Sequence, residues 1–173
     1  MRRGSWADLS RALARVDARL SAADVVRYTT TMACAACERI ERGRAGRDAD
    51  FVTTLPESVV FLADEQTYRG YCLVLLNDHV EHLGDLPLER QLRLWEDVAR
   101  VAAALRAHVA PVRINYACLG NFLTHVHWHV IPRHADDPEP QHPIWVRPLD
   151  ERHVALPDAE RRALITALRR ALA

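Results

Sequence analysis

The segment His125-Val126-His127-Trp128-His129-Val130-Ile131 decides the fold, because three histidines alternate in it with apolar residues. Successive side chains of a β-strand point to opposite faces, so the pattern predicts a strand with three imidazoles on one face and apolar side chains on the other. Imidazole titrates near neutral pH, attacks electrophiles and binds metal ions. We therefore expect this face to hold a metal ion or a histidine that does chemistry.

The composition is that of one ordinary globular domain. The chain has 173 residues, 49% of them hydrophobic and 27% charged, and 23 basic residues balance 23 acidic ones. This balance gives no general electrostatic signature of a nucleic-acid or membrane partner. Every basic residue is an arginine, which excludes a catalytic lysine. No apolar run approaches the length of a membrane span, and the N-terminus does not resemble a signal peptide, so we expect a cytoplasmic protein.

Apolar residues at helical spacing predict three helices, over residues 5–20, 88–109 and 158–172. The long middle helix follows Pro87 and ends before Pro111. Its apolar stripe is expected to consist of Leu92, Trp95, Val98, Ala99, Ala102, Leu105 and Val109. On the third helix, the leucines at 164, 168 and 172 share one face.

Shorter apolar runs predict strands before the histidine segment, over residues 58–63, 70–76 and 112–118. Residues 42–50 contain two glycines and three arginines and are expected to form a loop. Short strands around one long crossing helix indicate an α+β domain with an antiparallel sheet and extra helices at the termini.

The four cysteines divide into two kinds. In a cytosolic chain they are not expected to form structural disulfides. Cys72 and Cys118 lie in apolar runs, so they are expected to be buried, inert thiols. Cys34 and Cys37 form a Cys-x-x-Cys pair, which is a clamp for zinc, a redox pair, or two unligated thiols. The redox interpretation is disfavoured because no thioredoxin-like βαβ pattern surrounds the pair.

Residues 115–133 resemble the signature of the histidine triad (HIT) superfamily of nucleotide hydrolases and transferases. The family motif is His-φ-His-φ-His-φ-φ, with φ apolar, and the segment from His125 fits every position. Residues 73–80 resemble the strand and the His-Val pair before the family's long helix. Cys34-Ala35-Ala36-Cys37 lies where zinc-bearing members carry their Cys-x-x-Cys, and the Pro-Ile-Trp run at 143–145 is similar to a bacterial branch.

The resemblance implies a HIT-like antiparallel sheet and a division of the chain into three parts. Residues 25–140 form the HIT domain, residues 1–24 a helical extension before it, and residues 141–173 an extension that ends in a helix. Relatives are commonly homodimers, so a homodimer is expected.

The resemblance also implies roles for individual residues. The middle histidine, His127, is the nucleophile that forms a covalent nucleotidyl-histidine intermediate, and His129 hydrogen-bonds a phosphate oxygen. Asn121 stands where many members carry a Gln that touches the phosphate, and Asn is one methylene shorter. Asn115 is a further phosphate contact or a turn-forming residue, and Asp64 is near the position of an acidic residue on the ribose.

A structural zinc ion is the cofactor that the resemblance implies. A closed zinc site needs four nitrogen or sulfur ligands in a tetrahedron. Zinc-bearing relatives use positions that correspond here to Cys34, Cys37, His79 and His125, with His82 as the rival of His79. Arg133, at the end of the motif, either favours a polyphosphate substrate or is a solvated side chain, and the second interpretation is preferred.

The function implied is a hydrolase or transferase that releases a nucleoside monophosphate, and the branch similarity favours dinucleoside polyphosphates as substrates. Two alternatives stay open. The first is a non-catalytic nucleotide-binding or interaction module on the same fold. The second is a metalloenzyme in which all three histidines of the motif hold one metal ion, which a flat strand disfavours because it spreads the outer residues about 13 Å apart.

Overall fold

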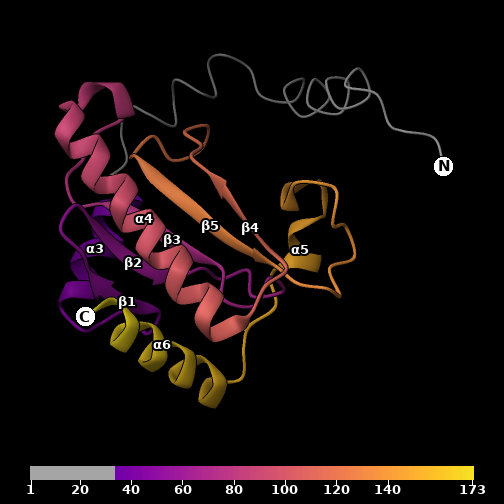
Figure 1. Ribbon diagram of the computed structural model, residues 1–173. Coiled ribbons are helices and arrows are strands. Elements are labelled where there is room, and N and C mark those ends of the chain that lie inside the picture. Colours follow the sequence, from indigo (N-terminus) through magenta and orange to yellow (C-terminus); the bar gives the residue numbers. More distant parts are fainter. Residues whose placement is uncertain (1–33) are drawn as a thin grey trace, which may run out of the picture. The chain divides into compact units, whose positions relative to one another are not determined.

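The computed structural model describes residues 34–173 (Figure 1). The predicted helix over residues 5–20, and the predicted extension at residues 1–24, lie outside the described residues. In chain order, the described elements are α3 (Ala35–Arg44), β1 (Phe51–Thr54), β2 (Ser58–Leu62), β3 (Cys72–Leu76), the 3-10 turn η1 (Leu83–Asp85), α4 (Leu88–Val109), β4 (Arg113–Ala117), β5 (His127–Arg133), the 3-10 turn η2 (Ile144–Val146), α5 (Leu149–Arg152) and α6 (Asp158–Leu172).

The five strands form one antiparallel sheet in the order β1-β2-β3-β5-β4. The histidine strand, β5, therefore lies between β3 and β4, and β4 is an edge strand (Figure 1). In the β3–β5 register, Leu75 pairs with His127 and Leu73 with His129. The predicted α+β fold with an antiparallel sheet is confirmed. Within residues 34–173, no helix is both long enough and apolar enough to cross a bilayer.

The two long helices, α4 and α6, cover one face of the sheet. The main core lies between them and the side chains of this face, among them Val60, Val74 and Val130. The three predicted leucines of α6 are buried in this core. Near the C-terminal end of α6, Arg169 donates to the backbone carbonyls of Phe51 and Val52, which links α6 to β1.

The bounds of α4 match the prediction, but its buried face does not. The helix begins after Pro87, and Ala110 in the left-handed conformation ends it. Asp97 is buried on this helix and accepts hydrogen bonds from the backbone N–H of Glu57 and the hydroxyl of Ser58. The predicted stripe is wrong at Leu92, Trp95 and Ala99, which are exposed; the buried residues are instead Leu94, Asp97, Val98, Val101, Ala102, Ala104, Leu105 and Val109.

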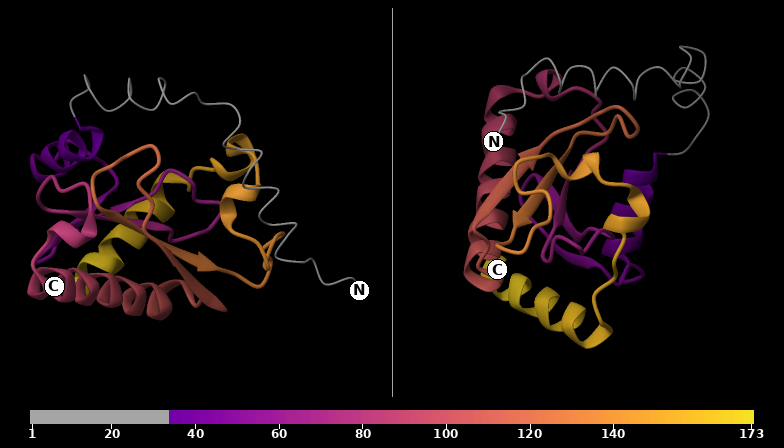
Figure 2. Two further views of the ribbon diagram at one scale, coloured as in Figure 1. Left: turned by 90° about the horizontal axis from the view of Figure 1, so that it is seen from above. Right: turned by 90° about the vertical axis from the view of Figure 1, so that its right-hand side faces the viewer.

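The opposite face of the sheet carries α3 and the histidines, and Figure 2 shows α3 on the other side of the sheet from α4. Ala36 and Ile40 of α3 pack against Val59, Phe61 and Leu75. A second apolar cluster lies farther along this face and includes Tyr68, Tyr71, Ile131 and Ile144. The side chains of the histidines lie on this face between the two clusters.

The predicted strands are confirmed within their runs, whereas α3 and β1 were not predicted. The predicted loop over residues 42–50 is wrong at its start, because Gly43 lies in the last turn of α3. A Cβ at Gly43 would lie 2.7 Å from atoms of Phe51 and of Phe61, so the glycine allows the helix to approach the sheet closely. Cys72 is buried as expected, but Cys118 follows the end of β4 and is exposed.

Candidate active site and metal centre

The alternation of β5 places His127 and His129 on the face of the sheet opposite α4. Trp128 and Val130, between and after them, pack into the core under α4. His125 lies just before the strand, and its side chain is fully buried. The three histidines thus enter two groups, one formed by His127 with His129 and one by His125 with the Cys-x-x-Cys pair.

His127 is buried, and its ring is fixed from one side. Its Nδ1 lies 2.7 Å from the backbone carbonyl oxygen of His125, two residues earlier in the chain. A carbonyl only accepts hydrogen bonds, so Nδ1 carries the proton and Nε2 has the free lone pair. That lone pair is directed towards His129, whose Nε2 lies 3.1 Å away. This is the tautomer that a nucleophilic imidazole requires.

His129 lies in apolar and aromatic surroundings. Its ring is 5.3 Å from the ring of Trp145, measured between centroids, in a near-perpendicular arrangement. Its Nδ1 lies 2.5 Å from the hydroxyl oxygen of Tyr71. Burial first, and then the nearby charge of His127, lower the pKa of His129 to about 4. At neutral pH its imidazole is therefore neutral, and it acts as a hydrogen-bonding group rather than a cation.

The second group brings together the four predicted metal ligands. The ligand atoms of Cys34, Cys37, His79 and His125 all lie within 4.8 Å of one another. Nδ1 of His125 is 3.6 Å from both sulfur atoms, and Nδ1 of His79 is 3.6 Å from Sγ of Cys37. In a tetrahedral site with Zn–N and Zn–S bonds of about 2.0 and 2.3 Å, nitrogen and sulfur are about 3.5 Å apart. The donor set and its spacing fit zinc.

The hydrogen bonds around this cluster leave the correct ring nitrogens free. Nε2 of His125 lies 2.8 Å from the carbonyl oxygen of Leu76, so Nε2 carries the proton and Nδ1 has the lone pair that faces the thiols. Burial lowers the pKa of His125, which favours the neutral form that binds metals. Burial, followed by the contact with Cys34, raises the pKa of Cys37 to about 11, so binding a metal would displace a proton from this thiol.

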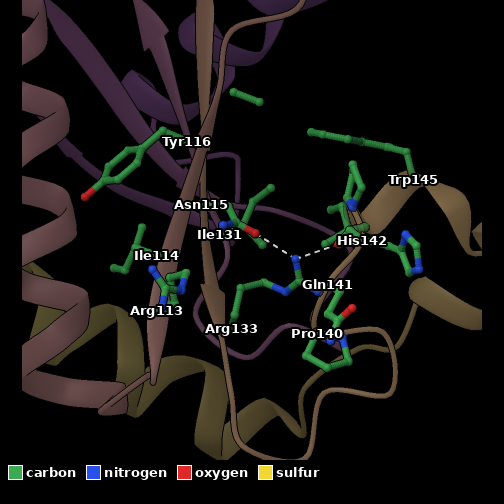
Figure 3. A pocket seen from close by; sticks show the side chains of 13 residues that line it. Arg113, Ile114, Asn115, Tyr116, Ile131, Arg133, Pro140, Gln141, His142 and Trp145 are labelled. Carbon is green, nitrogen blue, oxygen red and sulfur yellow. Dashed lines mark hydrogen bonds between the residues drawn. The ribbon is translucent and has the colours of Figure 1, made fainter. Parts of the chain in front are cut away.

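Asn115 and Arg133 lie beside the histidines, on β4 and β5. The preferred prediction of a solvated Arg133 is wrong, because its side chain is buried. It forms an ion pair with Asp137 and donates to the backbone carbonyls of Glu139 and His142. It also donates to Oδ1 of Asn115 at 2.7 Å. Figure 3 shows Arg133 between Asn115 and the segment that carries His142. The bond from Arg133 orients the Asn115 amide, and its N–H groups are what Asn115 can donate to a ligand.

A cavity of about 590 Å³ extends from this point along the edge of the sheet. Its lining includes Arg113 and Asn115 of β4, Gln141, and the aromatic ring of Trp145 (Figure 3). Ala117, which also lines it, pairs with His129 in the β4–β5 register. The cavity therefore adjoins the histidine pair, with Trp145 at the boundary.

The other two predicted substrate-binding residues, Asn121 and Asp64, lie outside the immediate surroundings of the histidine pair. Asn121 is exposed in the segment between β4 and β5, and its side chain has no hydrogen bond to another residue of the described part of the chain. Asp64 follows β2, and its carboxylate is 59% exposed and 3.7 Å from Arg39 of α3. Neither contacts the histidine pair directly.

The sequence did not indicate the roles of Tyr71 and Trp145 as neighbours of His129. Tyr71 begins the apolar run that became β3, and its position two residues before Leu73 puts it on the face that carries the histidines. The sequence alone predicts that Tyr71 and Leu73 share a face of one strand. The contact with His129 follows only once β3 is known to pair with β5.

The comparisons with known proteins agree with this geometry. The sequence profile of the HIT domain matches residues 44–136, which is more than half of the chain. The chain belongs to the HIT family. Family membership suggests that it binds nucleotides or catalyses hydrolysis or transfer of nucleotide groups. Comparison with curated protein sequences gives no significant match.

Several solved structures of HIT proteins share the fold. A histidine triad protein from Bradyrhizobium japonicum is 28% identical, covering 71% of this chain and 91% of its own, with a TM-score of 0.64. One from Sinorhizobium meliloti is 24% identical over 83% and 98%, with a TM-score of 0.65. A zinc-bound member from Mycobacterium smegmatis is 23% identical over 78% and 94%, with a TM-score of 0.58.

Proposed function

We propose that this HIT protein is a nucleotide-phosphate hydrolase or nucleotidyl transferase that acts through a covalent intermediate on His127. The observation that carries the proposal is the 2.7 Å contact between Nδ1 of His127 and the carbonyl oxygen of His125. It fixes the ring so that Nε2, the nitrogen with the lone pair, faces His129 and not the backbone. A non-catalytic nucleotide-binding module would not require this orientation.

The reaction proceeds in two displacements. Nε2 of His127 donates its electron pair to the phosphorus nearest the nucleoside, so a P–N bond forms and the bond to the leaving-group oxygen breaks. The leaving group departs with that electron pair and takes a proton from solvent. Water, or another acceptor in a transferase, then attacks the phosphorus, loses a proton and displaces His127. The carbonyl of His125 stabilises the positive charge on the imidazole of the intermediate, because it accepts from Nδ1–H throughout.

We propose that the substrate is a nucleotide, with dinucleoside polyphosphates as the favoured class. Asn115 would donate its amide N–H groups to the phosphate chain, because phosphate oxygens accept hydrogen bonds and the bond from Arg133 orients the amide. Asn121 and Asp64 remain proposed contacts to the phosphate and the ribose. The cavity beside Trp145 offers room for the leaving group, and the guanidinium of Arg113 on its wall suits an anionic one.

We propose that Cys34, Cys37, His79 and His125 hold a structural zinc ion. The spacing of the donor atoms supports this, and a related HIT protein from Mycobacterium smegmatis is described as zinc-bound. A bound zinc would stabilise the fold where α3 meets β5. The side chain of His125 would be fixed by the metal on one nitrogen and by Leu76 on the other.

We propose a homodimer that uses the outer side of α4 and the edge strand β4. The predicted apolar stripe residues Leu92 and Trp95 are exposed on α4, and Trp95 contacts the ring of Tyr116 on β4. Exposed apolar patches of this kind mark interaction surfaces. Trp95→Glu should shift the protein from dimer to monomer in sedimentation velocity, and a wild-type protein that is monomeric at micromolar concentration contradicts this proposal.

The proposed activity is tested by turnover of adenosine nucleotides and by trapping the intermediate. Wild-type protein should release adenosine monophosphate. When the reaction is quenched rapidly without acid, a nucleotidyl adduct should remain on His127, and peptide mass spectrometry should locate it there. His127→Ala should lose on the order of 10³-fold in rate while it still binds nucleotide. His108→Ala, an exposed histidine near the end of α4, is the matched control and should retain full activity. Nucleotide binding without turnover by the wild-type protein would establish the non-catalytic module instead.

A further inference from the structure

Tyr71 is a buried residue that the proposed chemistry does not use. It precedes β3 and shares a face of the sheet with Leu73, the residue that pairs with His129. Its hydroxyl oxygen is 2.5 Å from Nδ1 of His129, and the two rings are 5.9 Å apart between centroids. Burial raises the pKa of Tyr71, so the hydroxyl keeps its proton at neutral pH.

Only one arrangement of protons satisfies the hydrogen bonds that join these side chains. Nε2 of His127 is an acceptor, because Nδ1 of that ring donates to the carbonyl of His125. Nε2 of His129 lies 3.1 Å from this acceptor and must therefore donate. A neutral imidazole has a single N–H, so Nδ1 of His129 is unprotonated and accepts the hydroxyl proton of Tyr71.

The opposite tautomer of His129 is unfavourable on both sides of its ring. It would place two nitrogen lone pairs, those of His127 and His129, 3.1 Å apart. It would also turn the Tyr71 contact around, so that the phenol oxygen accepts and its own proton lacks a partner among the described residues. The contacts with His127 and with Tyr71 thus both favour the tautomer of His129 that carries its proton on Nε2.

We propose that Tyr71 is a positioning residue that holds His129 as the Nε2–H tautomer, so that this N–H can donate to the phosphate attacked by His127. The inference rests on the proposed function, in which His129 hydrogen-bonds the phosphate. With the other tautomer, a lone pair of His129 would face the phosphate oxygens and repel them. Loss of one well-placed donor to a developing charge costs roughly 10²–10³ in rate, which sets the upper limit for the effect of Tyr71.

Tyr68 supplies a matched control for Tyr71. Both tyrosines belong to the same apolar cluster, with Ile131 and Ile144. The hydroxyl of Tyr68 is buried but has no hydrogen-bond partner among residues 34–173. Tyr68→Phe therefore removes the same atom from the same cluster, near the guanidinium of Arg147, without removing a donor to a histidine, whereas Tyr71→Phe removes the donor to His129.

The kinetic test uses the full chain, purified without chelator, and an adenosine 5′-monophosphate ester with a fluorogenic leaving group. Tyr71→Phe should lower kcat by about 10-fold or more, with KM changed by less than about threefold, because the donor that it misplaces acts mainly on the charge that develops in the transition state. Tyr68→Phe should stay within about twofold of the wild type. Equal losses in the two variants, or an unchanged kcat in Tyr71→Phe, would overturn the assignment.

The tautomer itself can be measured without substrate by nuclear magnetic resonance of protein labelled with ¹⁵N-histidine. In the wild type, Nε2 of His129 should carry the proton and Nδ1 should not. In Tyr71→Phe, the proton should move to Nδ1 or exchange between the two nitrogens. A wild-type His129 protonated at Nδ1, or the same tautomer in both proteins, refutes the inference. Because this readout needs no turnover, it separates failure of the Tyr71 inference from failure of the proposed activity.

Discussion

The neutral state of His129, which its partly buried position favours, should make the protein less stable in mild acid. In the unfolded chain, a histidine is protonated below a pH of about 6.5. In the folded protein, burial lowers the pKa of His129 to about 4, with a further contribution from the charge of His127. Between these two values the unfolded state binds a proton that the folded state does not, so the free energy of unfolding falls as the pH falls.

The size of this effect follows from the two pKa values. They differ by about 2.5 pH units, and each unit corresponds to about 1.4 kcal/mol. The contribution of His129 is therefore about 3 kcal/mol over the range from pH 6.5 to pH 4, of which about 2 kcal/mol is lost by pH 5. Against a total stability of about 5–15 kcal/mol for a domain, such a loss is readily measured.

The assay is urea unfolding of the wild type and of His129→Gln at a series of pH values from 7 to 5. Glutamine does not titrate, so the wild type should lose about 2 kcal/mol more than the variant over this range. Protonation of the cysteine and histidine metal ligands affects both proteins and cancels in the difference. His108→Gln, which replaces an exposed histidine, should follow the wild-type curve. Parallel curves for the wild type and His129→Gln would show that His129 is not held neutral by its surroundings, and the reasoning would fail.

Three further predictions concern the metal cluster, the reaction path and Arg133. Purified protein should contain one zinc ion per chain, and Cys34→Ser should lower both the zinc content and the stability, since a structural zinc site contributes roughly 10 kcal/mol or more in favourable cases. A Cys34→Ser variant with full zinc content would place the metal elsewhere. Cleavage in ¹⁸O-labelled water should label the released monophosphate and retain configuration at phosphorus, because two in-line displacements each invert it; net inversion would mean that water attacks directly. Arg133→Met should destabilise the protein by about 3 kcal/mol, because it leaves the carboxylate of Asp137 buried and unpaired; an unchanged urea midpoint would contradict this.

Elements with a strong period could be predicted from the sequence, and elements held by close packing could not. The histidine strand and the bounds of α4 and α6 follow from alternation or helical spacing. In α4, however, apolar side chains occur on more than one side, so spacing alone could not separate the buried face from the exposed side chains of Leu92 and Trp95. In α3, Gly43 led to the wrong prediction of a loop. The glycine is needed there because Phe51 and Phe61 approach the helix closely, and the sequence pattern does not show that contact.

The candidate site shows the same limit. The sequence motif predicts which histidines matter, because their types and spacing are local. The roles of Tyr71 and Arg133 depend instead on partners that the sheet brings in from other strands and loops, such as the 2.5 Å contact between Tyr71 and His129. The alternation of side chains predicts a strand, but it does not predict that β3 pairs with β5 rather than with another strand.

His125 explains why the metal cluster and the candidate nucleophile occur within three residues of each other. Its side chain belongs to the Cys-His cluster, through Nδ1, while its backbone carbonyl holds Nδ1 of His127. A rotation of the backbone at His125 would therefore disturb both groups at once. With Nε2 bonded to the carbonyl of Leu76 on β3, the side chain is already held from a second strand, and a metal ion on its other nitrogen would fix it completely. In the proposed reaction, the cluster would therefore act on the chemistry without contacting the substrate, by fixing the carbonyl that holds Nδ1 of His127.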